Sequence, residues 1–144
     1  AVIVAKVDEN LNVIEGSQER VCCDTLLLSV GLIPANEIST KANVMLSSLT
    51  KGAIVDDYLQ TNQPGIFACG NVLHVHDLVD YVSNEAKLAG INAAKYLRDH
   101  LVLCQTITIS EEGGSRYVVP AVIQPKKDEK GIVRFRVDKV YQNK

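Results

Sequence analysis

Residues 61–71 have the sequence TNQPGIFACGN, which places a turn, a short apolar segment and a glycine in immediate succession. Pro64 and Gly65 are adjacent, as they would be at the two central positions of a type II β-turn. Residues 66–69 are apolar throughout, which predicts a strand that is buried on both faces. Gly70 then frees the backbone. The order predicts a buried strand followed at once by a sharp change of direction.

A helical pattern begins shortly after this strand. Apolar and small side chains recur at steps of three and four, which predicts a helix from about Asp80 to His100. We expect its mostly small face to pack closely on a sheet or a flat ligand, and it consists of Val82, Ala86, Ala89, Gly90, Ala93, Ala94 and Leu97. Four polar residues are expected to lie off that face, namely Glu85, Lys87, Asn92 and Lys95.

Upstream, the pattern predicts an antiparallel meander of three strands at residues 1–7, about 11–14 and 21–30, joined by short turns. Residues 25–30 are apolar on both faces, so we expect them to form a central strand. Gly31 and Pro34 follow, where the chain is expected to turn at the end of the sheet. Residues 36–49 give an ambiguous pattern, compatible with partial helix, and 52–56 predict another short strand.

The last third of the chain predicts strands again, at residues 106–109, 117–123 and 132–137. The last two are candidates for a hairpin. In the final strand, Val133, Phe135 and Val137 alternate with Arg134 and Arg136, which predicts an apolar buried face and a charged solvent face. We therefore expect a main region at residues 1–103 and a small β-rich segment at 104–144.

Composition narrows the class of protein. The 144 residues are 47% hydrophobic and 22% charged, as in an ordinary globular domain. The net charge of −2 and the lack of a basic, aromatic stretch argue against a nucleic-acid partner. The longest nearly uncharged stretch, 25–35, is too short to cross a bilayer, and no signal peptide is apparent, so we expect a cytoplasmic location. Because the chain begins inside an apolar run without Met, we expect it to be a fragment.

Residues 23–34 and 61–71, in this order and spacing, resemble the FAD/NAD(P)-binding pyridine nucleotide-disulfide oxidoreductase superfamily. Its pattern is an apolar strand ending in Gly-x-x-Pro, then Thr-x-x-x-Gly-Ile-Phe-Ala-x-Gly-Asp before the last flavin-domain helix. The resemblance covers residues 1–97. Residues 70–90 look most like the branch with hydrogen cyanide synthase, opine dehydrogenase and sarcosine oxidase subunits. The resemblance to the superfamily implies an α/β fold: a partial FAD/NAD(P)-binding domain, made of a β-meander and a βα unit, with a β-rich tail.

The resemblance also implies which residues bind the cofactors: Gly31, Pro34, Gly70, Asn71, Val79, Asp80 and Val82. Asn71 stands where the family usually has Asp, and its amide oxygen is expected to accept from the ribityl hydroxyls of FAD. The helix start at 79–82 is expected to point its N–H groups at the flavin. Two alternatives stay open: Asn71 is only a turn residue, and the helix only packs on a sheet.

His74, His76, Asp77 and Asp80 form the other group of chemically capable side chains. A metal site, a general acid beside the flavin and a solvated loop around the cofactor are the three interpretations. No Cys or further His completes a ligand set, and the four cysteines lack a CxxC pair, so we predict no metal. No catalytic residue is assigned.

No Gly-x-Gly-x-x-Gly occurs in the chain, so neither dinucleotide pyrophosphate has its glycine-rich loop here. The resemblance implies a parent enzyme that moves electrons between NAD(P)H and an acceptor through FAD. We expect this chain alone to bind no cofactor, to be inactive, to need a missing upstream segment and to self-associate. A non-catalytic binding or assembly subunit on the same fold is the first alternative, and a structural β-rich fragment with an accidental motif is the second.

Overall fold

The computed structural model describes residues 1–99, 106–124 and 131–141. The chain forms two compact units, Ala1–Gly31 and Leu32–Lys144. The predicted boundary between residues 103 and 104 falls outside the described residues and stays a prediction. None of the helices in the described ranges is both long and apolar enough to cross a membrane.

The first unit is a short antiparallel pair of strands. Strand β1 (Val2–Val4) pairs with β2 (Glu19–Val21), with Ile3 opposite Arg20. Between them, one bridge joins Val7 to Val13, and the carboxylate of Asp8 shapes the turn by accepting the backbone N–H groups of residues 10 and 12 at 2.9 and 2.8 Å. Antiparallel pairing was predicted correctly, but the predicted three-strand meander is wrong. Residues 11–14 form only the single bridge at Val13, and β2 overlaps the strand predicted at 21–30 only at Val21.

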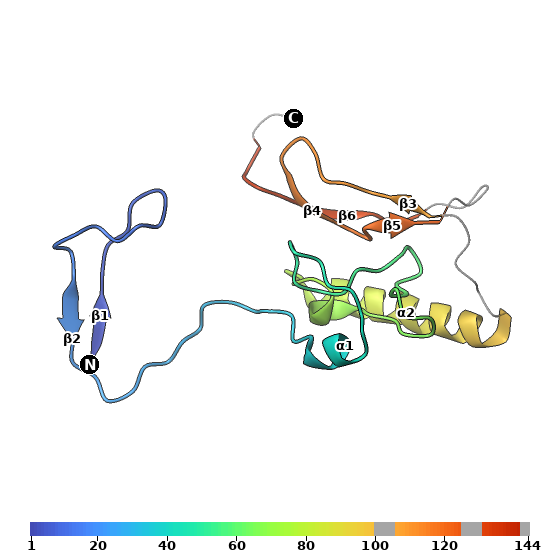
Figure 1. Ribbon diagram of the computed structural model, residues 1–144, viewed down its shortest axis with the longest axis horizontal. Helices are drawn as coiled ribbons and strands as arrows, with labels where there is room; N and C mark the ends of the chain where they lie inside the picture. The colour runs from blue at the N-terminus through green and yellow to red at the C-terminus, as the bar shows by residue number, and fades with distance from the viewer. Residues whose placement is uncertain (100–105, 125–130, 142–144) are drawn as a thin grey trace. The chain divides into compact units, whose positions relative to one another are not determined.

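The predicted central strand at residues 25–30 is wrong. The segment has no regular structure, as Figure 1 shows between β2 and α1, and Leu27 and Val30 are 90% and 89% exposed. A strand is stable only when a neighbouring strand takes its N–H and C=O groups. No described residue forms a β-pair with this segment. An apolar pattern indicates that a segment favours burial, but it does not indicate which strand, if any, pairs with that segment.

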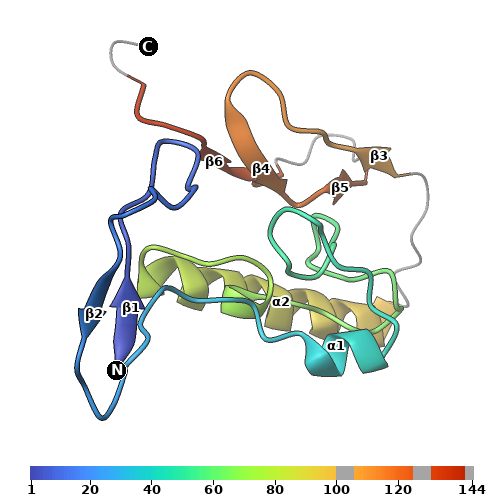
Figure 2. The ribbon, with the colours of Figure 1, turned by 60° about the vertical axis from the view of Figure 1, so that its left-hand side comes forward.

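The second unit contains all the helices of the described chain and four short strands. The helices are α1 (Glu37–Lys41), the 3₁₀ turn η1 (Gly70–Val72) and the long α2 (Val79–Asp99). Strand β3 (Ile107–Thr108) pairs with β5 (Val122–Ile123), and β4 (Ser115–Val119) pairs with β6 (Arg134–Val137), both antiparallel. Figures 1 and 2 both place these strands over one side of the layer formed by α2 and the loops before it.

The core of the second unit draws on loops more than on strands. Its buried apolar side chains are Val44, Ala53, Val55, Leu59, Leu73, Ala89 and Val119. The predicted strands at 52–56 and 66–69 are wrong, because only single bridges form, such as Val55 to Thr61 and Gln60 to Phe67. The predicted type II turn is confirmed: the Ile66 N–H donates to the Gln63 carbonyl at 3.1 Å, and Gly65 has φ +80°.

Helix α2 occupies the predicted range, but its buried face was predicted incorrectly. Glu85, Ala89 and Asn92 are buried, whereas Ala86, Gly90 and Ala94 are exposed. Both buried polar side chains have hydrogen-bond partners, which makes their burial possible. The Asn92 amide, for example, donates to the Tyr58 carbonyl at 2.9 Å. Ala89 is buried and Ala93 is half-buried, so these two residues of the predicted face do lie on the inner side of the helix.

The faces of β6 are also the reverse of the prediction. Phe135 is 65% exposed, while Arg134 and Arg136 are half-buried. The β4–β6 pairing itself was predicted. Its register sets Arg136 opposite Tyr117 and Arg134 opposite Val119, which is buried, so the arginines share the inner face with these residues. The strand predicted at 117–123 is divided between β4 and β5, which have different partners.

Candidate functional site

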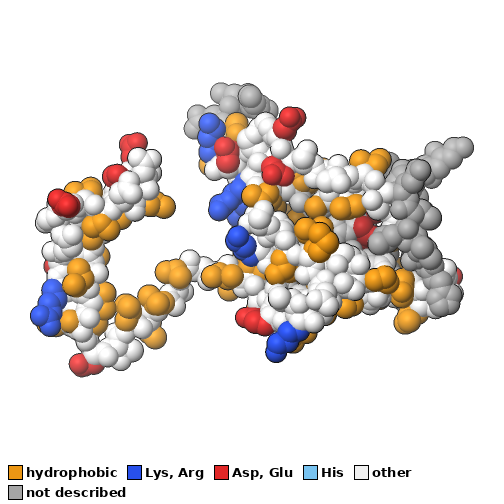
Figure 3. Space-filling model, viewed as in Figure 1, with side chains coloured by type: hydrophobic (Ala, Val, Ile, Leu, Met, Phe, Trp, Pro, Cys, Tyr) orange, Lys and Arg blue, Asp and Glu red, His pale blue; other side chains and the backbone are white. Residues whose placement is uncertain are grey.

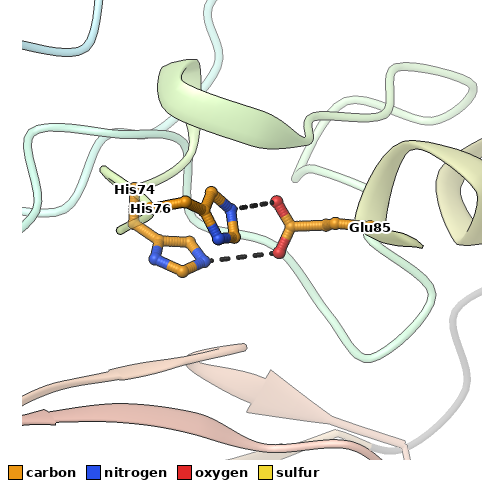
Figure 4. A group of neighbouring side chains, drawn as sticks. All are labelled: His74, His76 and Glu85. Carbon is orange, nitrogen blue, oxygen red and sulfur yellow. Dashed lines mark hydrogen bonds and ion pairs between the residues drawn. The ribbon is translucent and has the colours of Figure 1, made fainter. Parts of the chain in front are cut away.

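The buried carboxylate of Glu85, in the second turn of α2, is the centre of the candidate site. Its side chain is fully buried. Oε2 accepts the backbone N–H of Gly70 at 2.6 Å and faces His76 Nε2 at 2.9 Å. Oε1 lies 3.3 Å from His74 Nε2 and 3.5 Å from an Arg134 guanidinium nitrogen. Figure 4 shows both imidazoles converging on the two oxygens of this carboxylate.

The turn after residue 69 brings the imidazoles to the helix. Gly70 has φ +70°, a conformation that glycine adopts without strain. Its carbonyl then accepts the N–H groups of Leu73 and His74 at 2.9 and 3.2 Å, which closes the turn. Leu73 is 1% exposed and anchors the segment in the core. The rings of His74 and His76 lie side by side, with centroids 4.0 Å apart.

A glycine beneath this turn allows its close approach to the preceding loop. A Cβ added at Gly52 would lie 1.6 Å from the Leu73 carbonyl oxygen, which is a fixed backbone atom. No side chain larger than hydrogen fits there without moving the backbone. Gly52 therefore helps to fix the position of His74, the next residue along the chain.

The surroundings of Glu85 keep it ionised at neutral pH. Burial alone raises the pKa of this carboxyl group, because a charge loses its hydration. The hydrogen bonds from His74, the Gly70 N–H and His76 together outweigh the burial, so the pKa of Glu85 is lowered. With Nε2 of each imidazole directed at a carboxylate, neutral His74 and His76 carry their proton on Nε2 and leave Nδ1 as an acceptor.

A cavity of about 740 Å³ adjoins the cluster. It is lined on one side by residues 74–77 and Tyr81, and on the other by residues of β4, of β6 and of the segment after β6. Arg136 closes part of its wall, since its guanidinium contacts Asp77 at 2.8 Å and the Tyr117 hydroxyl at 3.2 Å. The volume is within the usual range for a small-molecule site.

The structure brings Gly70 and the first turn of α2, both among the predicted site residues, close together. A Cβ on Gly70 would lie 3.3 Å from Val82 Cγ1, so these residues are in close contact. Asn71 is exposed, and its Oδ1 accepts the His76 N–H at 3.3 Å. Val79 and Asp80 are exposed at the start of the helix.

Gly31 and Pro34 are the other two predicted site residues, and their part in cofactor binding stays a prediction. Gly31 is the last residue of the first unit, with φ +120°. Pro34 is half-buried on the way to α1. Pro34 is not among the described residues that contact Glu85.

Sequence reasoning missed Glu85, Arg134 and Arg136. Glu85 lies three residues after Val82 and four before Ala89, so it shares their stripe on the helix, which was the available signal. Its ligand atom and those of His74 and His76 all lie within 4.8 Å of one another, so Glu85 supplies the third potential metal ligand that the sequence lacked. Asp77 does not join them, because it pairs with Arg136.

Comparison with known families settles the relationship of the chain. The sequence profile of the pyridine nucleotide-disulphide oxidoreductases matches residues 2–87. The chain belongs to this family. The match includes the Gly70 turn and reaches Glu85, whereas Arg134 and Arg136 lie beyond it. The family is one of oxidoreductases with an FAD/NAD(P)-binding fold, whose members use FAD and NAD(P)H.

Individual relatives are distant. A nitric oxide reductase FlRd-NAD(+) reductase of Salmonella paratyphi A is 27% identical over 92 residues, which cover 64% of this chain and 24% of that protein. A mitochondrial dihydrolipoyl dehydrogenase of Caenorhabditis elegans is 38% identical over 60 residues, 41% of this chain and 12% of that protein. The chain thus spans at most about a quarter of the length of these relatives. No solved structure gives a significant match.

Proposed function

We propose that this chain is the flavin-facing part of an FAD-dependent enzyme that moves electrons between NAD(P)H and an acceptor. The observation that carries the proposal is the family match, which extends to residue 87. The matched part includes the hydrogen bond of 2.6 Å from the Gly70 N–H to Glu85 on α2. In this proposal Glu85 is a positioning residue, because it fixes the turn and the helix start relative to each other.

The residues at the turn fit a flavin cofactor. Gly70 has a positive φ, and a Cβ there would lie only 3.3 Å from Val82 Cγ1, so this position suits glycine, whose backbone no side chain covers. Asn71 is exposed, and its 3.3 Å contact with the His76 N–H is long enough to be exchanged for a ligand hydroxyl. Gly70, Asn71 and the N–H groups of residues 79–82 would hold FAD. When bound, FAD accepts a hydride from NAD(P)H and passes its electrons on.

His76 is the candidate proton carrier of the site. It lines the cavity, and Glu85 holds its Nε2 at 2.9 Å. An imidazole can serve as both proton donor and proton acceptor, and the carboxylate of Glu85 fixes the orientation of this ring. His76 therefore has the position and the chemistry to take up or release a proton at Nδ1 during electron transfer.

The proposal includes a partner segment. The glycine-rich loops that hold the dinucleotide pyrophosphates are expected in an upstream part of the parent protein, and residues 25–30 are expected to pair with strands there. Their exposure supports this, since Leu27 is 90% exposed. We also propose that the chain alone is inactive and self-associates, that the parent is cytoplasmic, and that it lies near the branch of hydrogen cyanide synthase, opine dehydrogenase and sarcosine oxidase subunits.

A non-catalytic assembly subunit is the second candidate function. The same exposed segment favours it, because an apolar stretch of this kind serves equally well to join another subunit. The two candidates differ in flavin content. Recovery of the upstream coding sequence and absorbance of the purified parent protein separate them, since an assembly subunit has no glycine-rich loop and no flavin.

Asn71→Leu in the complete parent protein tests the proposed cofactor site. Loss of the proposed hydrogen bond to a ribityl hydroxyl should weaken FAD binding roughly 5- to 150-fold. Asn71→Asp is the matched control and should bind FAD at least as well, because a carboxylate is the stronger acceptor. FAD titration into the apo-protein gives the dissociation constants. Equal constants for Asn and Leu would remove Asn71 from the site.

A further inference from the structure

We propose that the cavity beside His76 binds a small organic anion, with a carboxylate or phosphate group held by Arg116, Arg134 and Lys139. The cavity lies within the second unit and includes no residue of the first. Residues 116–139 lie outside the part of the chain matched by the family, so this site adds to the proposed flavin contacts and does not depend on them.

The charges around the cavity are mostly positive. Its lining includes Arg116, Arg134, Arg136 and Lys139 and a single carboxylate, Asp77. Arg136 pairs with Asp77, and Arg134 approaches the buried Glu85 at 3.5 Å. Within the described ranges, no carboxylate forms an ion pair with Arg116 or Lys139. Four cations and two carboxylates therefore leave an excess of two positive charges before either imidazole is protonated.

The fold aims these side chains at one space. The β4–β6 register is irregular between Ser115 and Tyr117, so Arg116 is the extra residue of a bulge, a feature that redirects a side chain. Arg134 shares the inner face of β6 with Arg136. Lys139 follows in the segment after the strand and also lines the cavity. Figure 3 shows Lys and Arg side chains gathered at the edge of the second unit near its C-terminal strands.

The cavity also offers an apolar wall for the rest of the ligand. Tyr81, Val133 and Val137 line it, and its volume of about 740 Å³ accommodates a small molecule. Guanidinium groups bind carboxylate and phosphate by paired hydrogen bonds. The ligand that suits this combination has one anionic group and a carbon skeleton.

A cation is a poorer fit than an anion, although His74, His76 and Glu85 offer three potential metal ligands. The guanidinium of Arg134 already lies beside the same carboxylate, and Gly70 donates to it at 2.6 Å. A metal ion would therefore add its charge next to a fixed positive charge and displace existing hydrogen bonds. An anion entering from the cavity side balances the excess charge.

Calorimetric titration of the 144-residue chain with inorganic phosphate and, separately, with benzoate tests the proposal. We expect one of the probes to bind, and the probe that binds distinguishes a phosphate ligand from a carboxylate ligand. The double variant Arg116→Gln, Lys139→Gln should weaken binding roughly tenfold or more, because two charge-assisted contacts are lost. Both side chains are exposed, so the fold should persist, as circular dichroism can check.

Lys87→Gln is the matched control, since Lys87 is an exposed cation on α2 away from the cavity. It removes one charge without touching the cavity and should leave the dissociation constant unchanged. Equal weakening by the control and by the double variant would show diffuse charge attraction and overturn the proposal. Failure of both probes to bind to a folded chain at low salt would also overturn it.

Discussion

Two buried carboxylates in the second unit have opposite surroundings. Asp56 is 4% exposed, and Glu85 is 0% exposed. Asp56 accepts the N–H groups of Tyr58 and Gln60, both at 2.9 Å, and the side-chain amide of Gln124 at 3.0 Å, all of them neutral donors. Glu85 faces two imidazoles and a guanidinium, in addition to the Gly70 N–H.

The difference appears in the ionisation of the two groups. Burial raises the pKa of Asp56, and its amide hydrogen bonds offset only part of that effect. Burial also opposes ionisation of Glu85, but hydrogen bonds from His74, Gly70 and His76 lower its pKa overall. A carboxylate among neutral amides holds the shape of a loop, whereas one among imidazoles and a guanidinium fixes charged groups beside a cavity. We therefore assign Asp56 to the architecture and Glu85 to the site.

Glu85→Gln should give the largest loss of stability. The substitution keeps the shape but removes the charge that His74, His76 and Arg134 share, and it leaves their donors facing a neutral amide. Breaking a buried charged cluster at one member costs roughly 2–4 kcal/mol. Urea denaturation followed by circular dichroism measures the change. A loss as small as that of an exposed substitution such as Lys87→Gln would contradict the description of the cluster.

The dependence of stability on pH should separate the two carboxylates. The folded-state pKa of Glu85 lies below its ordinary value of 4.5, so its contribution is present above pH 4.5 and is lost as the pH falls through the folded value. The contribution of Asp56 to stability changes with pH in the opposite direction. Its folded-state pKa lies above 3.8, so its contribution is present below pH 3.8 and is lost as the pH rises through the folded value.

The variants reveal each contribution in denaturation curves between about pH 3 and pH 7. Relative to the unmodified chain, Glu85→Gln should lose less stability on acidification, because the group that must be protonated is gone. Asp56→Asn should lose more, because the opposing group is gone. If both variants shifted the curve in the same direction, the assigned surroundings of one of the carboxylates would be incorrect.

Asp56→Asn should have the smallest effect on stability at neutral pH. The amide oxygen still accepts the N–H groups of Tyr58 and Gln60. Only the contact with Gln124 is lost, because the new amide NH₂ group would face the NH₂ group of Gln124, and both are donors. We expect a loss of about 1 kcal/mol or less, partly offset by the removal of a buried charge. Thermal denaturation measures it, with Asp56→Ala as the comparison that removes every acceptor and should cost more.

Features that depend on local sequence were predicted best. Helix α2, the turn at Pro64 and Gly65 and the pairing of β4 with β6 were predicted, because helical period, turn chemistry and strand alternation are local signals. These features depend on residues close to one another in the sequence.

The failures share a cause as well. Burial of Glu85 and the inward face of Arg134 depend on partners far away in the chain, so a rule that places charges outward assigned both to solvent. Residues 25–30 were predicted to be a central strand because they are apolar, but no described neighbour pairs with them. Long-range partners decide both outcomes, and composition and period do not specify them.

The most direct test is the NAD(P)H-dependent turnover proposed for the complete parent protein, measured across pH with Glu85→Gln and Asp56→Asn compared at equal flavin content. Glu85 positions His76 at 2.9 Å, so its substitution should lower kcat and displace the pH profile. Asp56→Asn should leave the profile in place. Rescaling to the folded, flavin-bound fraction removes any effect of stability alone. Unchanged profiles in both variants, or the same displacement in both, would contradict the assignment of Glu85 to the working site.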